Sequence, residues 1–406
     1  MGGVMRDEAI RIFKAGVAAA DPYHAVDRML RENPVAAGDK LLVLAVGKAA
    51  IRMAQAAVAH VAGAEVVVIT NYENAQDADY AKVFAAGHPV PDEGGAKAAQ
   101  YVITKLQALR QRDQVLALIS GGGSALMPAP PGGISLQDKA EVNRLLLSCG
   151  AEIGEMNLVR QQISTLKGGG LLRIAAPAQV RALILSDVVG DDLRLIASGP
   201  TVVPVGTRKQ AVALLKSYAV WDDLPASVQA HLSTPAPELP PLPQAENRLV
   251  GSNPISVAAM EQTAGAATVH PDPLTGDVAQ AAEIILKSGM GTTLFGGETT
   301  VKLTGTGLGG RNQELALRVA LLAEQQGWGD GWLFLSGGTD GRDGPCDAAG
   351  GIVDGSTLKR MRNAGLSPEA MLANNDSYHA LQAAGDLLMT GATGTNVADL
   401  QVLIRR

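Results

Sequence analysis

The chain has 406 residues, of which 47% are hydrophobic and 18% charged, and its formal net charge is −6. This length predicts two or three domains, and the apolar fraction is sufficient for a large core. The acidic balance, without a long basic run, argues against nucleic-acid binding. Two cysteines are too few for a disulfide framework or a zinc cluster, which is typical of a reducing cytoplasm.

The N-terminal segment predicts an amphipathic helix. Ile10, Phe13 and Val17 fall on one face, and charged residues fall on the other. The segment lacks the apolar stretch of a signal peptide, and no run in the chain approaches the roughly 18 apolar residues of a membrane span. We therefore expect a cytoplasmic protein with no membrane partner.

Short, continuously apolar runs alternate with helix-like segments along the chain. Such runs are typical of strands buried on both faces, as in parallel sheets covered by helices. The alternation predicts an open α/β layer architecture. The expected strands lie at 40–47, 65–70, 114–120, 181–187, 291–297 and 332–338, and the expected helices include 48–60, 94–111, 135–154 and 311–326.

A proline-rich segment interrupts this alternation. Residues 232–246 hold five prolines and show almost no periodic pattern. Proline cannot continue a helix or a central strand, so such a segment predicts a stiff connector. We place a domain boundary near residue 240, which gives α/β domains at 1–240 and 241–406, with the ligand site expected in the cleft between them.

The segment 120–124, Ser-Gly-Gly-Gly-Ser, directly follows a predicted strand. In open α/β sheets ligands bind beyond the carboxyl ends of the strands, and glycine there lets backbone N–H groups face an anion. We interpret this loop as a phosphate site; the alternative is a tight turn that needs positive φ angles. The loop lacks both the Gly-Lys-Ser/Thr ending of a P-loop and the closing glycine of a hydrolase nucleophile elbow.

Two cations stand at the starts of predicted helices. Lys48 follows Gly47, and Arg311 follows a glycine-rich loop. The helix dipole disfavours a cation at this end, so both positions indicate an anionic ligand, although a solvated side chain is the alternative. Arg311 could hold a carboxylate or a phosphoryl group through a bidentate fork.

Acidic residues follow two of the predicted strands. Asp187 lies directly at a strand end and is a candidate for contacting a substrate hydroxyl, whereas we expect Asp191 and Asp192 to cap a helix. Asp340 and Asp343 lack the spacing of a calcium loop but could contribute to a magnesium site together with substrate phosphates.

The roles of two further sequence features, a glycine motif and a histidine, remain open. Gly305, Gly307 and Gly310 match the dinucleotide pattern G-x-G-x-x-G, but the next strand-end acid, Asp340, lies about 30 residues further on instead of the roughly 20 expected. His88, between a glycine and a proline, is at least as consistent with a structural turn as with catalysis.

Taken in order, the loops resemble those of the class II glycerate kinases, or glycerate 2-kinases, whose C-terminal region is called the multi-organism fragment rich in leucine (MOFRL). The resemblance runs from about residue 5 to 402. One departure is Ala392, where the family has proline. The motifs that carry the resemblance are VGKAA, AGHPVPD, SGGGSAL, SDVVGDDLRLIASGPT, GGETTVKLTGTGLGGRNQELAL, SGGTDGRDGP and TGATGTNVADL.

The resemblance implies ATP-dependent phosphorylation of D-glycerate to 2-phosphoglycerate. It also implies a Rossmann-like N-terminal domain, a smaller α/β C-terminal domain and an active site in the interdomain cleft. Lys48 and Arg311 match the family's Gly-Lys and Gly-Gly-Arg-Asn-Gln-Glu motifs, so the resemblance makes them the main active-site cations.

We combine these expectations into one mechanistic hypothesis. Lys48 and Arg311 would neutralise the transferring phosphoryl group and the glycerate carboxylate, and Asp187 would orient the C2 hydroxyl and accept its proton. Mg²⁺ would bind near Asp340 or Asp343. The residues expected to bind ATP are Ser120, Gly121, Gly122, Gly123 and Ser124, with Gly338, Thr339 and Asp340.

Two alternatives come from other functional classes. An NAD(P)H-dependent hydroxypyruvate reductase would use the loop from Gly305 to Gly310, and a non-catalytic sugar-phosphate sensor would use the same anion loops without turnover. The sequence leaves the oligomeric state open, with a homodimer as one alternative.

Overall fold

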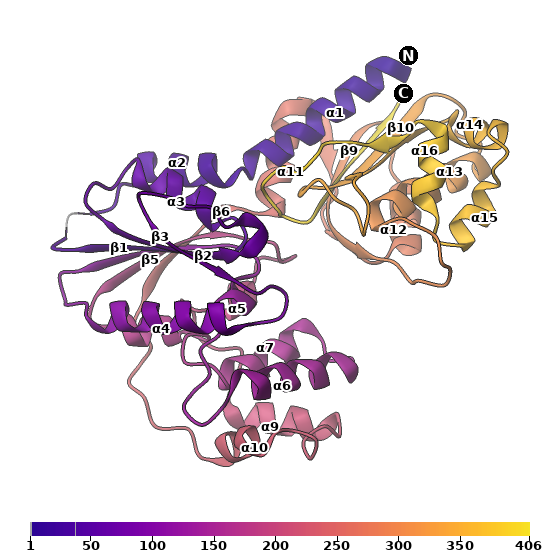
Figure 1. Cartoon of the computed structure of the whole chain (residues 1–406). Helices are drawn as coiled ribbons and strands as arrows, with labels where there is room; N and C mark the ends of the chain where they lie inside the picture. Colours follow the sequence, from indigo (N-terminus) through magenta and orange to yellow (C-terminus); the bar gives the residue numbers. More distant parts are fainter. Residues whose placement is uncertain (1, 37) are drawn as a thin grey trace. The chain divides into compact units, whose positions relative to one another are not determined.

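The structure is a computed structural model that describes residues 2–36 and 38–406. The chain forms two compact units (Figure 1): Pro22–Val250 is one, and the residues up to Asp21 together with Gly251–Arg406 are the other. Among the described residues, no helix combines the length and the apolar character needed to cross a bilayer.

The unit Pro22–Val250 contains a six-stranded sheet with the order β3-β2-β1-β4-β5-β6. The pairs β3–β2, β2–β1, β1–β4 and β4–β5 are parallel. This order is that of the Rossmann fold, so the Rossmann-like prediction is confirmed. The strands are β1 (Leu41–Val46), β2 (Glu65–Asn71), β3 (Lys82–Ala86), β4 (Gln114–Ile119), β5 (Gln179–Leu185) and β6 (Ala245–Gly251).

Helices cover both faces of this sheet. In Figure 1, α2 (Pro22–Glu32) and α3 (Ala50–Val58) lie on one side and α4 (Glu93–Gln107) lies on the other. The strands have buried side chains on both faces, as the continuously apolar runs predict. Two short helices, α5 (Gly123–Leu126) and α8 (Gly170–Ala175), follow β4 and precede β5.

A separate helical cluster is inserted between these strands. It consists of α6 (Leu136–Ser148), α7 (Ile153–Gln162), α9 (Arg208–Ser217) and α10 (Ala226–Ser233), which share their own apolar core and lie together in Figure 1. The single helix expected at 135–154 is wrong, because Gly150, with φ of +75°, ends the first helix. A capping box between Glu152 and Glu155 begins the second.

The other unit contains a sheet with the order β12-β11-β10-β13-β9-β7, and β8 pairs with β9. Its central pairs, β10–β11, β10–β13 and β13–β9, are antiparallel. The expectation of parallel strands is wrong here, because a continuously apolar run shows that both faces are covered and says nothing about direction. The strands are β7 (Ala267–Val269), β8 (Leu274–Asp277), β9 (Gly291–Thr300), β10 (Trp332–Gly338), β11 (Gly350–Asp354), β12 (Leu387–Leu388) and β13 (Asp399–Arg405).

Helices pack on both faces of this second sheet. The helices α1 (Gly2–Ala19) and α11 (Asn253–Ala264) bury one face, which includes Leu335 and Val402. The opposite face, with Phe334 and Leu403, is covered by the remaining helices of the unit. These helices are α12 (Val278–Leu286), α13 (Arg311–Gln325), α14 (Thr357–Asn363), α15 (Pro368–Ala373) and α16 (Ser377–Ala384).

The division between the units differs from the boundary expected near residue 240. The proline-rich segment does not end the first unit, because β6, which follows it, still belongs to the Rossmann-like sheet. In addition, α1 belongs to the second unit, where Ile12 and Phe13 are fully buried. The order of elements along the chain suggests that α1 belongs to the domain that directly follows it. Its apolar face is buried instead in the core of the second unit.

Lys139 of α6 is a buried cation without a carboxylate partner among the described residues. It is 1% exposed, and its Nζ donates a long hydrogen bond of 3.5 Å to Ile163 O. Burial, and secondarily the charge of Arg160, lower the pKa of Lys139 from 10.5 to about 8. The folded state therefore binds this proton less tightly than the unfolded chain does, which lowers stability at neutral pH.

We predict that Lys139→Met raises the free energy of unfolding at pH 7 by about 1–3 kcal/mol, because it removes the cost of a buried charge. The gain should shrink as the pH rises from about 8 to 10.5, where the wild-type lysine is neutral in both states. Urea unfolding at several pH values measures this. The exposed Lys97, changed to Met, is the control; equal stability of Lys139→Met and wild type at pH 7 would contradict the prediction.

Candidate active site

The turn after β4, which holds the Ser-Gly-Gly-Gly-Ser loop, is joined to the turn after β1. Ser120 Oγ accepts a hydrogen bond from Ala49 N at 3.1 Å, and Lys48 N donates to Gly121 O at 2.9 Å. Because β1 and β4 are parallel neighbours, both turns lie at the carboxyl edge of the sheet, where the sequence predicts the ligand site.

The glycines of this loop are needed because other side chains approach the backbone closely. A Cβ on Gly121 would overlap the carboxylate of Asp187, and one on Gly122 would lie 3.1 Å from the His88 ring and 3.3 Å from Lys48 Cγ. Gly122 also has a φ of +85°, which disfavours any other residue. The immediate neighbours of the loop are therefore the protein's own ionisable side chains.

Lys48, His88 and Asp187 thus converge on the Gly121–Gly122 backbone. They follow β1, β3 and β5, and we call this group the glycine-loop cluster. The side chain of Lys48 is exposed, and those of His88 and Asp187 are half-buried. The structure therefore brings together two predicted site residues, and it adds His88, which the sequence left undecided. The missed signal was its position at a strand end, like that of Lys48 and Asp187.

The His88 imidazole is neutral at neutral pH. Burial lowers its pKa most, the nearby charge of Lys48 lowers it further, and Glu73 opposes both effects. A neutral imidazole in contact with the loop can accept a proton from a bound hydroxyl group.

Ser124 is tied to groups that the sequence analysis did not identify. Lys167 Nζ donates to both Ser124 O and Ser124 Oγ at 2.7 Å, and Ser124 Oγ lies 2.9 Å from Ser198 Oγ. Asp192 does not have the expected helix-capping role: the helical turn Ile196–Ser198 begins after Leu195 without a side-chain cap, and Asp192 Oδ1 instead accepts from Arg194 N at 2.9 Å in a local turn.

In the second unit, Arg311 begins α13 and its guanidinium fork is occupied by protein carboxylates. Its Nε and Nη2 donate to Asp399 at 2.6 and 3.0 Å, and its Nη1 donates to Glu298 Oε1 at 2.7 Å. The Asp399 side chain is 1% exposed, and burial raises its pKa to about 6 against the opposing effect of Arg311. We call these three residues the arginine cluster; a guanidinium has five N–H donors, so two remain for a ligand.

Gly338 and Thr339 do not have the free donors that phosphate binding requires. Gly338 N donates to Ala349 O at 2.8 Å, and the N and Oγ1 of Thr339 both donate to Ala398 O, at 3.0 and 2.7 Å. The donor of Gly338 thus holds the end of β10 to the residue before β11, and those of Thr339 hold the next residue of the chain to the residue before β13. The prediction that these two residues bind ATP is therefore not supported by their bonding. The role of the half-buried Asp340 in binding ATP and Mg²⁺ stays a prediction.

Asp343 has a structural role in place of the expected magnesium ligation. Its carboxylate accepts from Asn312 N at 3.1 Å and from Gln313 N at 2.8 Å, and it is 3% exposed. Both oxygens therefore cap the N-terminus of α13, and we withdraw Asp343 as a metal ligand. This cap fixes the helix start that carries Arg311.

The loop that matches the dinucleotide pattern is packed against protein. Gly305 N donates to Asn375 Oδ1 and Gly307 N to Asn374 O, both at 2.9 Å. A Cβ at Gly305 or Gly307 would overlap the chain at Asn374 and Asp376. These glycines are explained by close packing of two loops, and the preceding β9 lies in a mixed sheet, unlike the first strand of a dinucleotide-binding βαβ unit.

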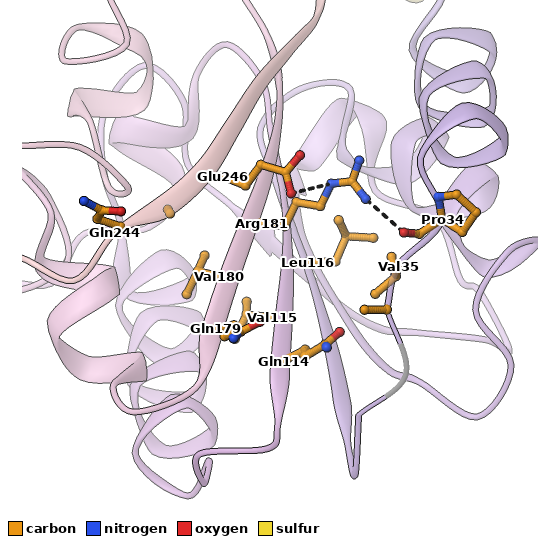
Figure 2. A pocket seen from close by; sticks show the side chains of 12 residues that line it. Pro34, Val35, Gln114, Val115, Leu116, Gln179, Val180, Arg181, Gln244 and Glu246 are labelled. Atoms are coloured by element: carbon orange, nitrogen blue, oxygen red, sulfur yellow. Dashed lines mark hydrogen bonds and ion pairs between the residues drawn. The ribbon is translucent and has the colours of Figure 1, made fainter.

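A cavity of the first unit lies away from these residues. It has a volume of about 500 Å³ and is lined by the amino-terminal ends of β4, β5 and β6, with Arg181 reaching towards Glu246 and Pro34 (Figure 2). Ligands of open α/β sheets bind at the opposite, carboxyl ends of the strands. The glycine-loop cluster of one unit and the arginine cluster of the other are therefore treated as two separate candidate sites.

Two family models and several known proteins match this chain. Residues 8–233 match the family described as a domain of unknown function, DUF4147, and residues 291–399 match the MOFRL family. A D-glycerate 2-kinase of Thermotoga maritima is 40% identical over 97% of this chain and 96% of its own length. An Agrobacterium vitis protein, provisionally named a hydroxypyruvate reductase, is 40% identical over 97% of this chain and 93% of its own.

A solved structure shows the same fold. The crystal structure of a Thermotoga maritima glycerate kinase superposes with a TM-score of 0.92 at 38% identity and covers 100% of both chains. Sequence and structure therefore agree over both units, and the chain belongs to the glycerate kinase family with DUF4147 and MOFRL regions.

Proposed function

We propose that this chain transfers the γ-phosphoryl group of ATP to the C2 hydroxyl of D-glycerate, which gives 2-phosphoglycerate and ADP. The convergence of Lys48, His88 and Asp187 on a glycine backbone at the carboxyl edge of the Rossmann-like sheet carries the proposal. Membership of the glycerate kinase family supports the substrate, and a cytoplasmic location, where ATP is available, is part of the proposal.

Phosphoryl transfer needs positioning and charge neutralisation more than covalent chemistry. The exposed ammonium group of Lys48, next to the loop of residues 120–124, would neutralise the transferring phosphoryl group. Asp187 would orient the C2 hydroxyl and accept its proton while the hydroxyl oxygen attacks the γ-phosphorus and ADP departs. His88, being neutral, is the second group able to take this proton.

Arg311 would bind the other anionic group of the reactants. Asp399 and Glu298 hold its guanidinium in place, and its two remaining N–H donors would bind the glycerate carboxylate or a phosphate oxygen. The carboxylates fix the direction of these donors, which reduces the entropy lost when a ligand binds.

Mg²⁺ is also part of the proposal. No three histidine, cysteine or carboxylate side chains gather as a metal site in residues 2–36 and 38–406. Magnesium in nucleotide sites is often held by one or two carboxylates together with phosphate oxygens, and the half-buried Asp340 fits the carboxylate ligand of such a site. Bound there, the ion would neutralise charge on the phosphates.

The hydroxypyruvate reductase alternative loses its structural basis. It requires a nicotinamide cofactor on the Gly305–Gly310 loop, but the chain at Asn374 and Asp376 occupies the space next to Gly305 and Gly307. The sensor alternative gives no reason for a lysine, a neutral histidine and an aspartate to meet on one loop, since binding alone needs no proton acceptor.

We predict that a phosphorus NMR time course with D-glycerate, ATP and Mg²⁺ shows a growing 2-phosphoglycerate signal, because the proposed acceptor is the C2 hydroxyl. A 3-phosphoglycerate signal would keep the kinase and contradict the acceptor position. If no phosphoryl group is transferred, the proposal fails as a whole.

We predict that Lys48→Ala lowers kcat by about 10²–10³-fold, the loss expected when one charge-stabilising donor is removed from a transition state. The exposed side chain predicts an unchanged melting temperature. The matched control is Lys97→Ala, which removes an exposed lysine of α4 outside the cluster. A kcat near that of the wild type in Lys48→Ala would remove Lys48 from the mechanism.

We predict that Arg311→Ala destabilises the protein by about 3–5 kcal/mol, because it leaves the buried carboxylate of Asp399 unpaired. Adding Asp399→Asn should restore part of the stability but none of the activity, since the ligand-binding N–H groups stay absent. Urea unfolding and kcat are measured on the single and double variants. Recovery of kcat in the double variant would show that Arg311 acts only on folding.

A further inference from the structure

Three cations, Lys139, Arg160 and Lys167, lie close to one another, and Lys167 contacts Ser124 at the end of the glycine loop. Lys139 and Lys167 are 1% and 6% exposed, and Arg160, half-buried, donates to Asn143 Oδ1 at 2.8 Å. Within the described part of the chain, none of the three forms an ion pair with a carboxylate. A buried charge without a counter-ion is costly, so this arrangement needs an explanation.

Lys167 is connected to the glycine loop by a hydrogen-bond chain of fixed direction. Ser198 Oγ donates to Asn157 Oδ1 at 2.5 Å, so Ser198 accepts from Ser124, and Ser124 Oγ in turn accepts from Lys167 Nζ. Lys167 Nζ also donates to Ser124 O. It therefore holds both the backbone and the side chain of the last residue of the loop.

The backbone on the far side of this chain is strained. Ala197 and Ser198 have φ angles of +49° and +60°, values that residues other than glycine rarely adopt. Gln161 Nε2 donates to Ser198 O at 3.1 Å and holds the strained turn in place. The turn packs closely on the glycine loop, because a Cβ added to Gly123 would lie only 3.0 Å from Ala197 Cβ. Strain of this kind is retained where the surrounding structure imposes it, often at functional sites.

Burial and the neighbouring cations disfavour the ammonium form of Lys167. Burial has the largest effect and the charges of Lys139 on α6 and Arg160 on α7 add to it, so the pKa of Lys167 lies well below its ordinary range. On the turn before Ser198, Arg194 is neutralised by Asp192. Across the loop, Lys48, His88 and Asp187 contact Gly121 and Gly122. A phosphate bound to the loop would supply the missing negative charge.

We infer that Lys167 is a proton-linked positioning residue, neutral while the glycine loop is empty and protonated when nucleotide phosphates occupy the loop. The inference rests on the proposed function, which assigns nucleotide binding to this loop. The proton comes from solvent and adds to the Nζ lone pair, and no bond other than N–H is formed. Binding and protonation stabilise each other, so nucleotide affinity falls as the pH rises, by up to tenfold per pH unit.

The test is isothermal titration calorimetry with ADP and Mg²⁺ in buffers of different ionisation enthalpy at pH 7 to 9. The number of protons taken up is obtained from the dependence of the binding enthalpy on the buffer. The wild type should take up a proton fraction that Lys167→Met does not. The nucleotide and the glycine-loop cluster are the same in both proteins and so do not contribute to the difference. Lys139, with a pKa of about 8, also titrates in this range, and the Lys139→Met variant described below separates its contribution.

Two further variants keep the test decisive if Lys167→Met does not fold. Lys167→Arg keeps a permanent charge and should bind ADP without this uptake. Lys139→Met removes a neighbouring cation, which should move the uptake to higher pH without abolishing it. Equal proton uptake by wild type and Lys167→Arg would overturn the inference alone. A wild type that binds no nucleotide would overturn the proposed function with it.

Discussion

The fit between the Gly121–Gly122 backbone and the side chains above it is the constraint on which the Rossmann-like unit depends. Parallel strands bring the ends of β1, β3, β4 and β5 to one edge of the sheet, but they do not bring side chains into contact. Contact also requires that one of the turns have no side chains of its own. The glycines after β4 do this, and residues from three other turns occupy the space.

The arginine cluster is built on a different principle. A helix cap positions its members: Asp343 caps α13 and thereby fixes the helix start from which Arg311 extends to Asp399 and Glu298. Two carboxylates and one guanidinium leave this group with a formal negative charge, whereas the region around Lys167 has an excess of positive charge. The two units therefore differ in their charged groups: one holds a guanidinium fixed between two carboxylates, and the other holds buried cations without carboxylate partners among the described residues.

The sequence predicts much of this arrangement, and its failures have identifiable causes. The strands, the open α/β architecture, and Lys48 and Asp187 at strand ends follow from local pattern alone, whereas the Rossmann-like sheet was implied by the family resemblance. Asp399 and Lys167 could not be found in this way, because their partners Arg311 and Ser124 are 88 and 43 residues away in the chain. The bonding of Gly338 and Thr339 could not be predicted, because a glycine-rich strand end has the same sequence pattern whether its donors face a ligand or a neighbouring segment.

The position of α1 has a consequence for how the protein forms during synthesis. Ile12 and Phe13 of α1 complete a core whose other members include Leu400 and Val402 of β13, and Glu8 pairs with the last residue, Arg406. Because β13 is also a central strand, the core that α1 shares with it cannot close until β13 has left the ribosome. The Rossmann-like unit, which lies between α1 and the rest of this unit in the chain, can fold before that.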